Sequence, residues 1–174
     1  MFASAFHVGR LVTWVGVFAV LGGIPKLLFL FLPEDWNRHT LAVASGGKPV
    51  YAGEAIHWAP DILLVAAAVT VVVGTVFVYL HSLTVNTFQA WGGEVDGRTL
   101  PVADAPVPAR LMVKGFRAVR TVVALVGVGL ILAGVPLFWM AIVNGDILDR
   151  MGLVKMITGG GAGLATGAAF YSHR

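Results

Sequence analysis

The sequence predicts an all-α integral membrane protein with about four transmembrane helices in an antiparallel bundle. Of its 174 residues, 57% are hydrophobic and only 12% are charged, which leaves too few polar side chains to cover a soluble globule. Apolar runs of about 20 residues recur along the chain, and an α-helix of that length crosses a hydrocarbon core about 30 Å thick. The net charge of +3 is too small for a nucleic-acid surface, so nucleic acid is excluded as a partner.

We expect one membrane domain over residues 1–174, with spans at about 11–32, 62–81, 121–143 and 152–171. The first span is interrupted near its end by Gly22-Gly23-Ile24-Pro25-Lys26, where proline removes a backbone donor. The second span has no charged residue from Ile62 to Leu80, and Asp61 before it suits a helix N-terminus. Each span is long enough to cross a bilayer once.

Extramembrane loops are expected at 33–60 and 84–120. In the first loop, the apolar triplet at 41–43 and the pair at 50–51 flank a Gly-rich turn, which allows a small hairpin. The second helix is expected to continue beyond the membrane toward Trp91, where Gly92 and Gly93 end it. A basic, amphipathic helix from Ala109 is expected to lead into the third span, which has a proline kink at Pro136.

The distribution of Lys and Arg predicts that both termini are cytoplasmic. Seven basic residues fall on the side of the termini and five on the opposite side, and cytoplasmic loops carry the excess of positive charge. The seven are Arg10, Arg98, Arg110, Lys114, Arg117, Arg120 and Arg174, and the five are Lys26, Arg38, Lys48, Arg150 and Lys155. We therefore expect a multi-pass protein of a prokaryotic inner (cytoplasmic) membrane.

The last predicted span carries a glycine zipper. Gly159, Gly163 and Gly167 recur at four-residue spacing, which makes a flat ridge where another helix can approach closely. The ridge favours docking to other membrane subunits or to a second copy of the chain. The alternative is internal packing against the first or third span.

Lys26 is an intramembrane cation within the first span. A charge at such a position is a candidate functional group, with a buried ion pair or a substrate contact as its role. The alternative, which we favour from the sequence, is that its long side chain reaches the nearby membrane interface.

Five histidines are the residues suited to haem or a transition metal. In the expected topology His7, His81 and His173 share one interface, so they are the candidates for a haem b or metal site. The alternative is that they are ordinary interfacial residues. At the same side, the face formed by Arg110, Lys114, Arg117 and Arg120 favours anionic lipid headgroups, so bound lipids are expected.

Familiar catalytic motifs are absent from the sequence, since it contains no phosphate-binding loop, nucleophile elbow, zinc-protease helix or dinucleotide fingerprint. We therefore expect a small, non-catalytic structural or assembly subunit of a larger membrane complex of respiratory, photosynthetic or secretion type. Two alternatives stay open. One is a redox subunit that holds haem b or contacts quinone through the interfacial histidines, and the other is a self-associating small transporter or channel.

Overall fold

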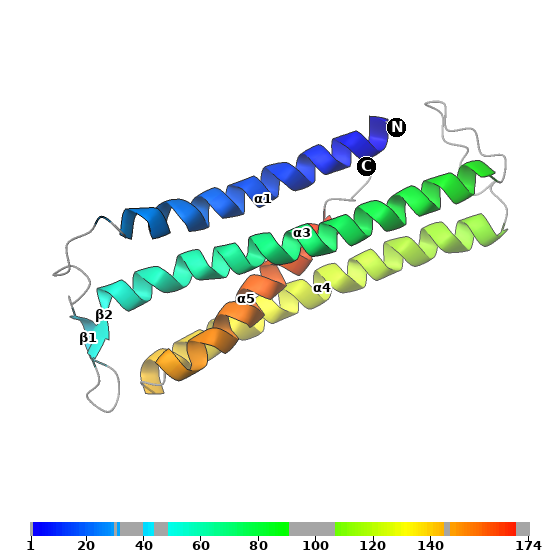
Figure 1. Ribbon diagram of the computed structural model, residues 1–174. Coiled ribbons are helices and arrows are strands. Elements are labelled where there is room, and N and C mark those ends of the chain that lie inside the picture. The colour runs from blue at the N-terminus through cyan, green and yellow to red at the C-terminus, as the bar shows by residue number, and fades with distance from the viewer. Residues whose placement is uncertain are drawn as a thin grey trace.

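A computed structural model describes residues 2–29, 31, 40–43, 49–90, 107–144 and 147–169. These residues form four helices and one short hairpin (Figure 1). The helices are α1 (Phe2–Phe29), α3 (Ala52–Ala90), α4 (Val107–Asn144) and α5 (Ile147–Ala169), and the strands are β1 (Thr40–Val43) and β2 (Pro49–Tyr51). The predicted helical fold class is thereby confirmed.

Consecutive helices alternate in direction; α1, α3 and α4 lie in a row, and α5 crosses obliquely between α3 and α4 (Figure 1). α5 packs against both α3 and α4, whereas α1 packs mainly against α3. The spatial order is therefore α1, α3, α5 and α4, with the last helix inserted between the second and third. α1 and α4 form the two edges of the row and carry many exposed large apolar side chains, among them Val12, Leu27, Leu125 and Leu132.

Within the residues that the structure describes, three helical segments are long and apolar enough to cross a membrane: Val8–Leu28, Pro60–Thr84 and Val107–Ala141. These spans indicate a membrane protein. α5 has 23 residues, which is about 34 Å of helix, but its many glycines and its charged residues make it less apolar than the other three.

The helix boundaries correct several expectations. α3 begins at Ala52, so Asp61 lies in the helix interior and does not stand at its N-terminus. α3 ends at Ala90, which confirms that this helix continues toward Trp91. Within the first expected loop, residues 52–60 are helical as part of α3, and the helix expected from Ala109 is present within α4. The basic entry helix and the third span form one continuous helix that passes through Pro136.

Two clusters of buried side chains hold the ends of the row together. At the hairpin end, Trp58 of α3 packs with Ala141 of α4 and with Met151 and Val154 of α5. Its ring also meets Phe138 edge to face at a centroid distance of 6.2 Å, a favoured aromatic geometry. At the other end, the cluster joins the first and last helices to the second, and its buried members are Leu11, Phe77 and Ala168.

The hairpin is antiparallel, and its register pairs Thr40 with Tyr51, Ala42 with Val50 and Val43 with Pro49. This confirms the small hairpin that the apolar residues allow. Because β2 runs directly into α3, the hairpin lies at the same end of the row as the N-terminus of α3.

Candidate charged site at the hairpin end

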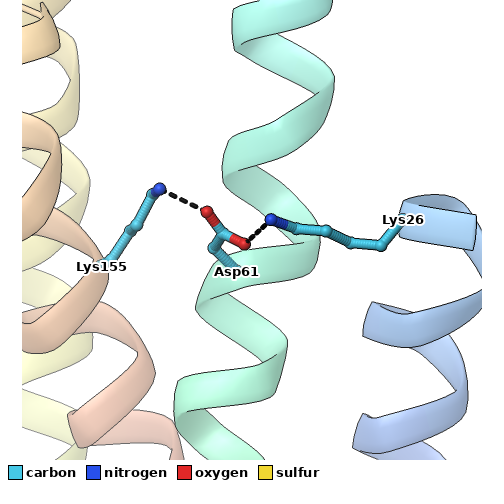
Figure 2. A network of polar contacts seen from close by, with 3 residues as sticks. All are labelled: Lys26, Asp61 and Lys155. Carbon is cyan, nitrogen blue, oxygen red and sulfur yellow. Dashed lines mark hydrogen bonds and ion pairs between the residues drawn. The ribbon is translucent and has the colours of Figure 1, made fainter. Parts of the chain in front are cut away.

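Three charged side chains from three helices meet near the hairpin end of the row. Lys26 comes from α1, Asp61 from α3 and Lys155 from α5 (Figure 2). The Lys26 ammonium pairs with Asp61 Oδ1, and the Lys155 ammonium donates a hydrogen bond to Asp61 Oδ2. A single carboxylate is therefore shared by two lysines that approach it from opposite sides (Figure 2).

Close helix contacts fix the backbone on both sides of Asp61. A Cβ atom on Gly22 of α1 would lie 2.9 Å from the carbonyl oxygen of Pro60, and one on Gly159 of α5 would lie 2.6 Å from that of Ile62. Both distances are too short for a side chain, so only glycine allows these approaches. α3 is consequently held between its two neighbours at the residues that flank the carboxylate.

Each lysine lies one helical turn from the glycine on its own helix. Gly22 and Lys26 are four residues apart in α1, and Lys155 and Gly159 are four residues apart in α5. Residues at this spacing share one helix face, so a helix that packs through its glycine also points its lysine at α3. The local sequence thus explains why both ammonium groups reach the same carboxylate.

Two of the three charges, Lys26 and Asp61, lie at the ends of candidate spans, and Lys155 lies in α5. Lys26 is two residues from the end of Val8–Leu28, and Asp61 is the second residue of Pro60–Thr84. The side chains are 35% exposed for Lys26, 22% for Asp61 and 24% for Lys155. The site therefore lies where two candidate spans end, and its side chains remain partly accessible from outside the protein.

The charge balance determines what the site can do chemically. Two ammonium groups face one carboxylate, which leaves one positive charge without a counter-charge within the trio. An ammonium group has three N–H donors, so each lysine can bind another acceptor besides Asp61. The arrangement suits the binding of an anion.

For Lys26 the structure shows an ion pair with Asp61, one of the two roles expected of an intramembrane cation, and its side chain is 35% exposed. The sequence pattern predicts Asp61 at a helix N-terminus and Lys155 only as one of the basic residues, so neither partner of Lys26 follows from it. The signal in the sequence was the matched spacing of glycine and lysine in the first and last helices, together with an acidic residue beside a proline in the second.

The three glycines of the ridge, Gly159, Gly163 and Gly167, all lie against α3. Added Cβ atoms would come within 2.9 Å of valine Cβ atoms on that helix, namely Val65, Val69 and Val73. The ridge therefore packs within the chain, on the second span, whereas the expected internal neighbours were the first and third. The opposite side of α5 meets α4, where Gly161 approaches the carbonyl oxygen of Gly127.

The histidine trio lies mostly outside the described residues. The side chain of His7 and the whole of His173 are not described, and the His81 ring lies 6.0 Å from that of Phe116 in α4. In the parts of the chain that the structure describes, no three metal-ligating side chains gather. Haem b or metal binding by these histidines stays a prediction.

The basic residues of α4 lie at the end of the row that is remote from the hairpin. Lys114 and Arg117 are exposed, while Arg110 and Arg120 are half-buried. The helix they occupy packs back on α3 through Phe116, which meets Phe77 edge to face at 5.8 Å. Contact of this face with anionic headgroups also stays a prediction.

Comparison with known proteins adds no relative: no protein-family model, curated protein or solved structure matches this chain.

Proposed function

We propose that the chain is a non-catalytic structural subunit of a larger complex in a prokaryotic inner membrane. In this proposal it crosses the bilayer four times, with α5 as the fourth span and both termini in the cytoplasm. A structural role is supported by the hydrogen bonds of several described threonine hydroxyls, which are made within their own helices. The Oγ1 atoms of threonines within or beside the spans donate to carbonyl oxygens four residues earlier in their own helices, as in Thr13, Thr70, Thr75, Thr121 and Thr166.

The observation that carries the proposal is an uncovered glycine stripe on α1. Gly9, Gly16 and Gly23 recur every seven residues, a spacing that keeps them close to one face of the helix. Among the described residues, a Cβ atom on any of the three would meet nothing within 4 Å. Gly22 beside them is different, because it packs tightly on α3.

A stripe of this kind fits a partner helix. In a membrane, helices associate through close backbone approach, and small residues at regular spacing allow it. The ridge on α5 is already covered by α3, so we assign the partner to the outer edge of α1. The partner in this proposal is a helix of another membrane subunit.

The test compares two glycine variants of α1. Gly16→Leu should leave the isolated chain folded and remove the larger assembly, measured as the mass of the complex purified in mild detergent from its native membrane. Gly22→Leu should unfold or destabilise the chain itself, because its side chain would collide with α3. If Gly16→Leu leaves the mass of the complex unchanged, the assembly role on this face is wrong.

An absorption spectrum of the same preparation tests the redox alternative. A Soret band in the wild-type protein that is lost in His81→Ala would replace the structural role by haem binding. A mass that corresponds to copies of this chain alone would instead favour the self-associating transporter or channel.

A further inference from the structure

The trio of Lys26, Asp61 and Lys155 offers more than helix packing, because its charges do not balance. Two lysines share one aspartate, and an excess positive charge at the edge of the hydrocarbon core is costly unless an anion or water compensates it. The lysine side chains are 35% and 24% exposed, so an anion can reach them from outside the protein. The excess positive charge therefore favours the binding of an anion at this site.

We propose that Lys26 and Lys155 together bind one phosphate-type oxyanion, supplied by the headgroup of an anionic phospholipid. Each ammonium nitrogen is within hydrogen-bond reach of the same carboxylate, so the two nitrogens are no more than about 8 Å apart. Phosphate oxygens are spaced much like those of a carboxylate, and one phosphate group can therefore contact both lysines. Each ammonium keeps donors for the phosphate after it has bound Asp61.

The depth of the site identifies the headgroup as the source. Lys26 is two residues from the end of its span, which is about 3 Å along the helix. Lipid phosphates occupy the layer just outside the hydrocarbon core, which is the layer that this end of the helices reaches. A lipid in that position also finds apolar surface beside the charges, since Leu27 and Leu28 are each 60% exposed.

The glycine contacts hold the two lysines in place before the lipid binds. Gly22 and Gly159 fix α1 and α5 against α3 on either side of Asp61, and each lysine is four residues from its glycine. In this arrangement the negative charge of Asp61 offsets part of the positive charge that attracts the phosphate. Removal of the carboxylate should therefore strengthen lipid binding, whereas removal of either lysine should weaken it.

The test titrates delipidated, full-length protein in a neutral detergent and counts bound lipid by native mass spectrometry. The probes are phosphatidylglycerol and a diacylglycerol with the same acyl chains, which lacks the phosphate. The wild type should bind phosphatidylglycerol in preference to diacylglycerol. Lys26→Gln and Lys155→Gln should each weaken that binding about fivefold, and Asp61→Asn should strengthen it.

Arg150→Gln is the matched control, because it removes one positive charge from the same helix as Lys155 without touching the trio. Its affinity for phosphatidylglycerol should stay within about twofold of the wild type, given the screening of separated charges.

Competition with inorganic phosphate distinguishes the source of the oxyanion. If millimolar phosphate fails to displace the lipid, a headgroup is supported. If millimolar phosphate displaces the lipid, the lipid assignment is overturned in favour of free phosphate. Equal binding of phosphatidylglycerol and diacylglycerol would show that the lysines do not bind a phosphate group. The same conclusion follows if Asp61→Asn loses binding as Lys155→Gln does, since that would make the trio a purely structural contact.

Discussion

A Cβ atom placed on Gly163 of α5 would lie 2.5 Å from the Cβ atom of Val69 on α3. It would also come within 2.8 Å of the Ala66 carbonyl oxygen, so the backbone itself leaves no room for a methyl group. Gly163→Ala must push the two helices apart, and we expect it to lower the free energy of unfolding by about 1–3 kcal/mol. Gly163→Leu should prevent recovery of folded protein, as judged by yield and by particle size in detergent.

Gly160 provides the matched control for this prediction, because it lies on the same helix and an added Cβ would meet nothing within 4 Å. Gly160→Ala should leave the protein as stable as the wild type or more stable by up to about 1 kcal/mol, since alanine favours helix over glycine. Leu164→Ala should also be far milder than Gly163→Leu. Equal losses in Gly160→Ala and Gly163→Ala would mean that α5 does not pack on α3 through this ridge.

Thr158 carries a buried hydroxyl for which the described residues provide no hydrogen-bond partner. Its Oγ1 atom faces Gly134 of α4, where it blocks the position of a Cβ atom. Thr158→Val replaces the hydroxyl by a methyl group of similar size, so we expect a gain in the free energy of unfolding of about 1 kcal/mol. Thermal unfolding in detergent measures this change.

Thr70→Val should change the free energy of unfolding in the opposite direction in the same experiment. The Oγ1 atom of Thr70 is fully buried, donates to the Ala66 carbonyl oxygen at 2.7 Å and lies 3.5 Å from that of Gly163. Thr70→Val loses these contacts and should lower the free energy of unfolding by about 0.5–1 kcal/mol. A stability loss of the same size in Thr158→Val would show that its hydroxyl is also satisfied.

Hydropathy predicted the helices from the sequence because an apolar run of about 20 residues has few alternatives to a membrane-spanning helix. It predicted their ends less well. Asp61 borders the uncharged run, so its position resembled that of a capping residue, yet α3 begins nine residues earlier at Ala52. Hydropathy marks where a helix enters lipid, and a helix can start well before that point.

The charged trio could not be predicted in the same way, because it depends on which helices become neighbours. The sequence indicated that the α5 ridge would allow close packing, but α3 and α4 both offer small or β-branched residues to it. The structure places Gly163 on α3 and Gly161 on α4, and only this choice brings Lys155 to Asp61. The residues of the trio can be found in the sequence, but their contacts depend on which helices pack together.

The topology is testable with single cysteines, since the chain has none of its own. Substitutions at Asp96 and Ser172 should be labelled from the cytoplasmic side, and one at Ser45 from the opposite side, because seven of the twelve basic residues fall on the first side. Labelling of Ser172 together with Ser45 would show that α5 does not cross the membrane. Labelling of all three from one side would contradict the membrane topology as a whole.

The stability of single-charge variants should be asymmetric within the trio. Asp61→Asn leaves Lys26 and Lys155 as two like charges around a neutral amide, whereas Lys26→Gln or Lys155→Gln leaves one balanced pair. We therefore expect Asp61→Asn to lower the free energy of unfolding by about 1–2 kcal/mol, and each lysine variant by less than about 1 kcal/mol, since all three groups are partly exposed. Adding Lys26→Gln to Asp61→Asn should restore part of the loss, because it removes one of the two repelling cations. Thermal unfolding of the delipidated protein in a neutral detergent measures all four variants, and additive losses in the double variant would rule out a shared carboxylate.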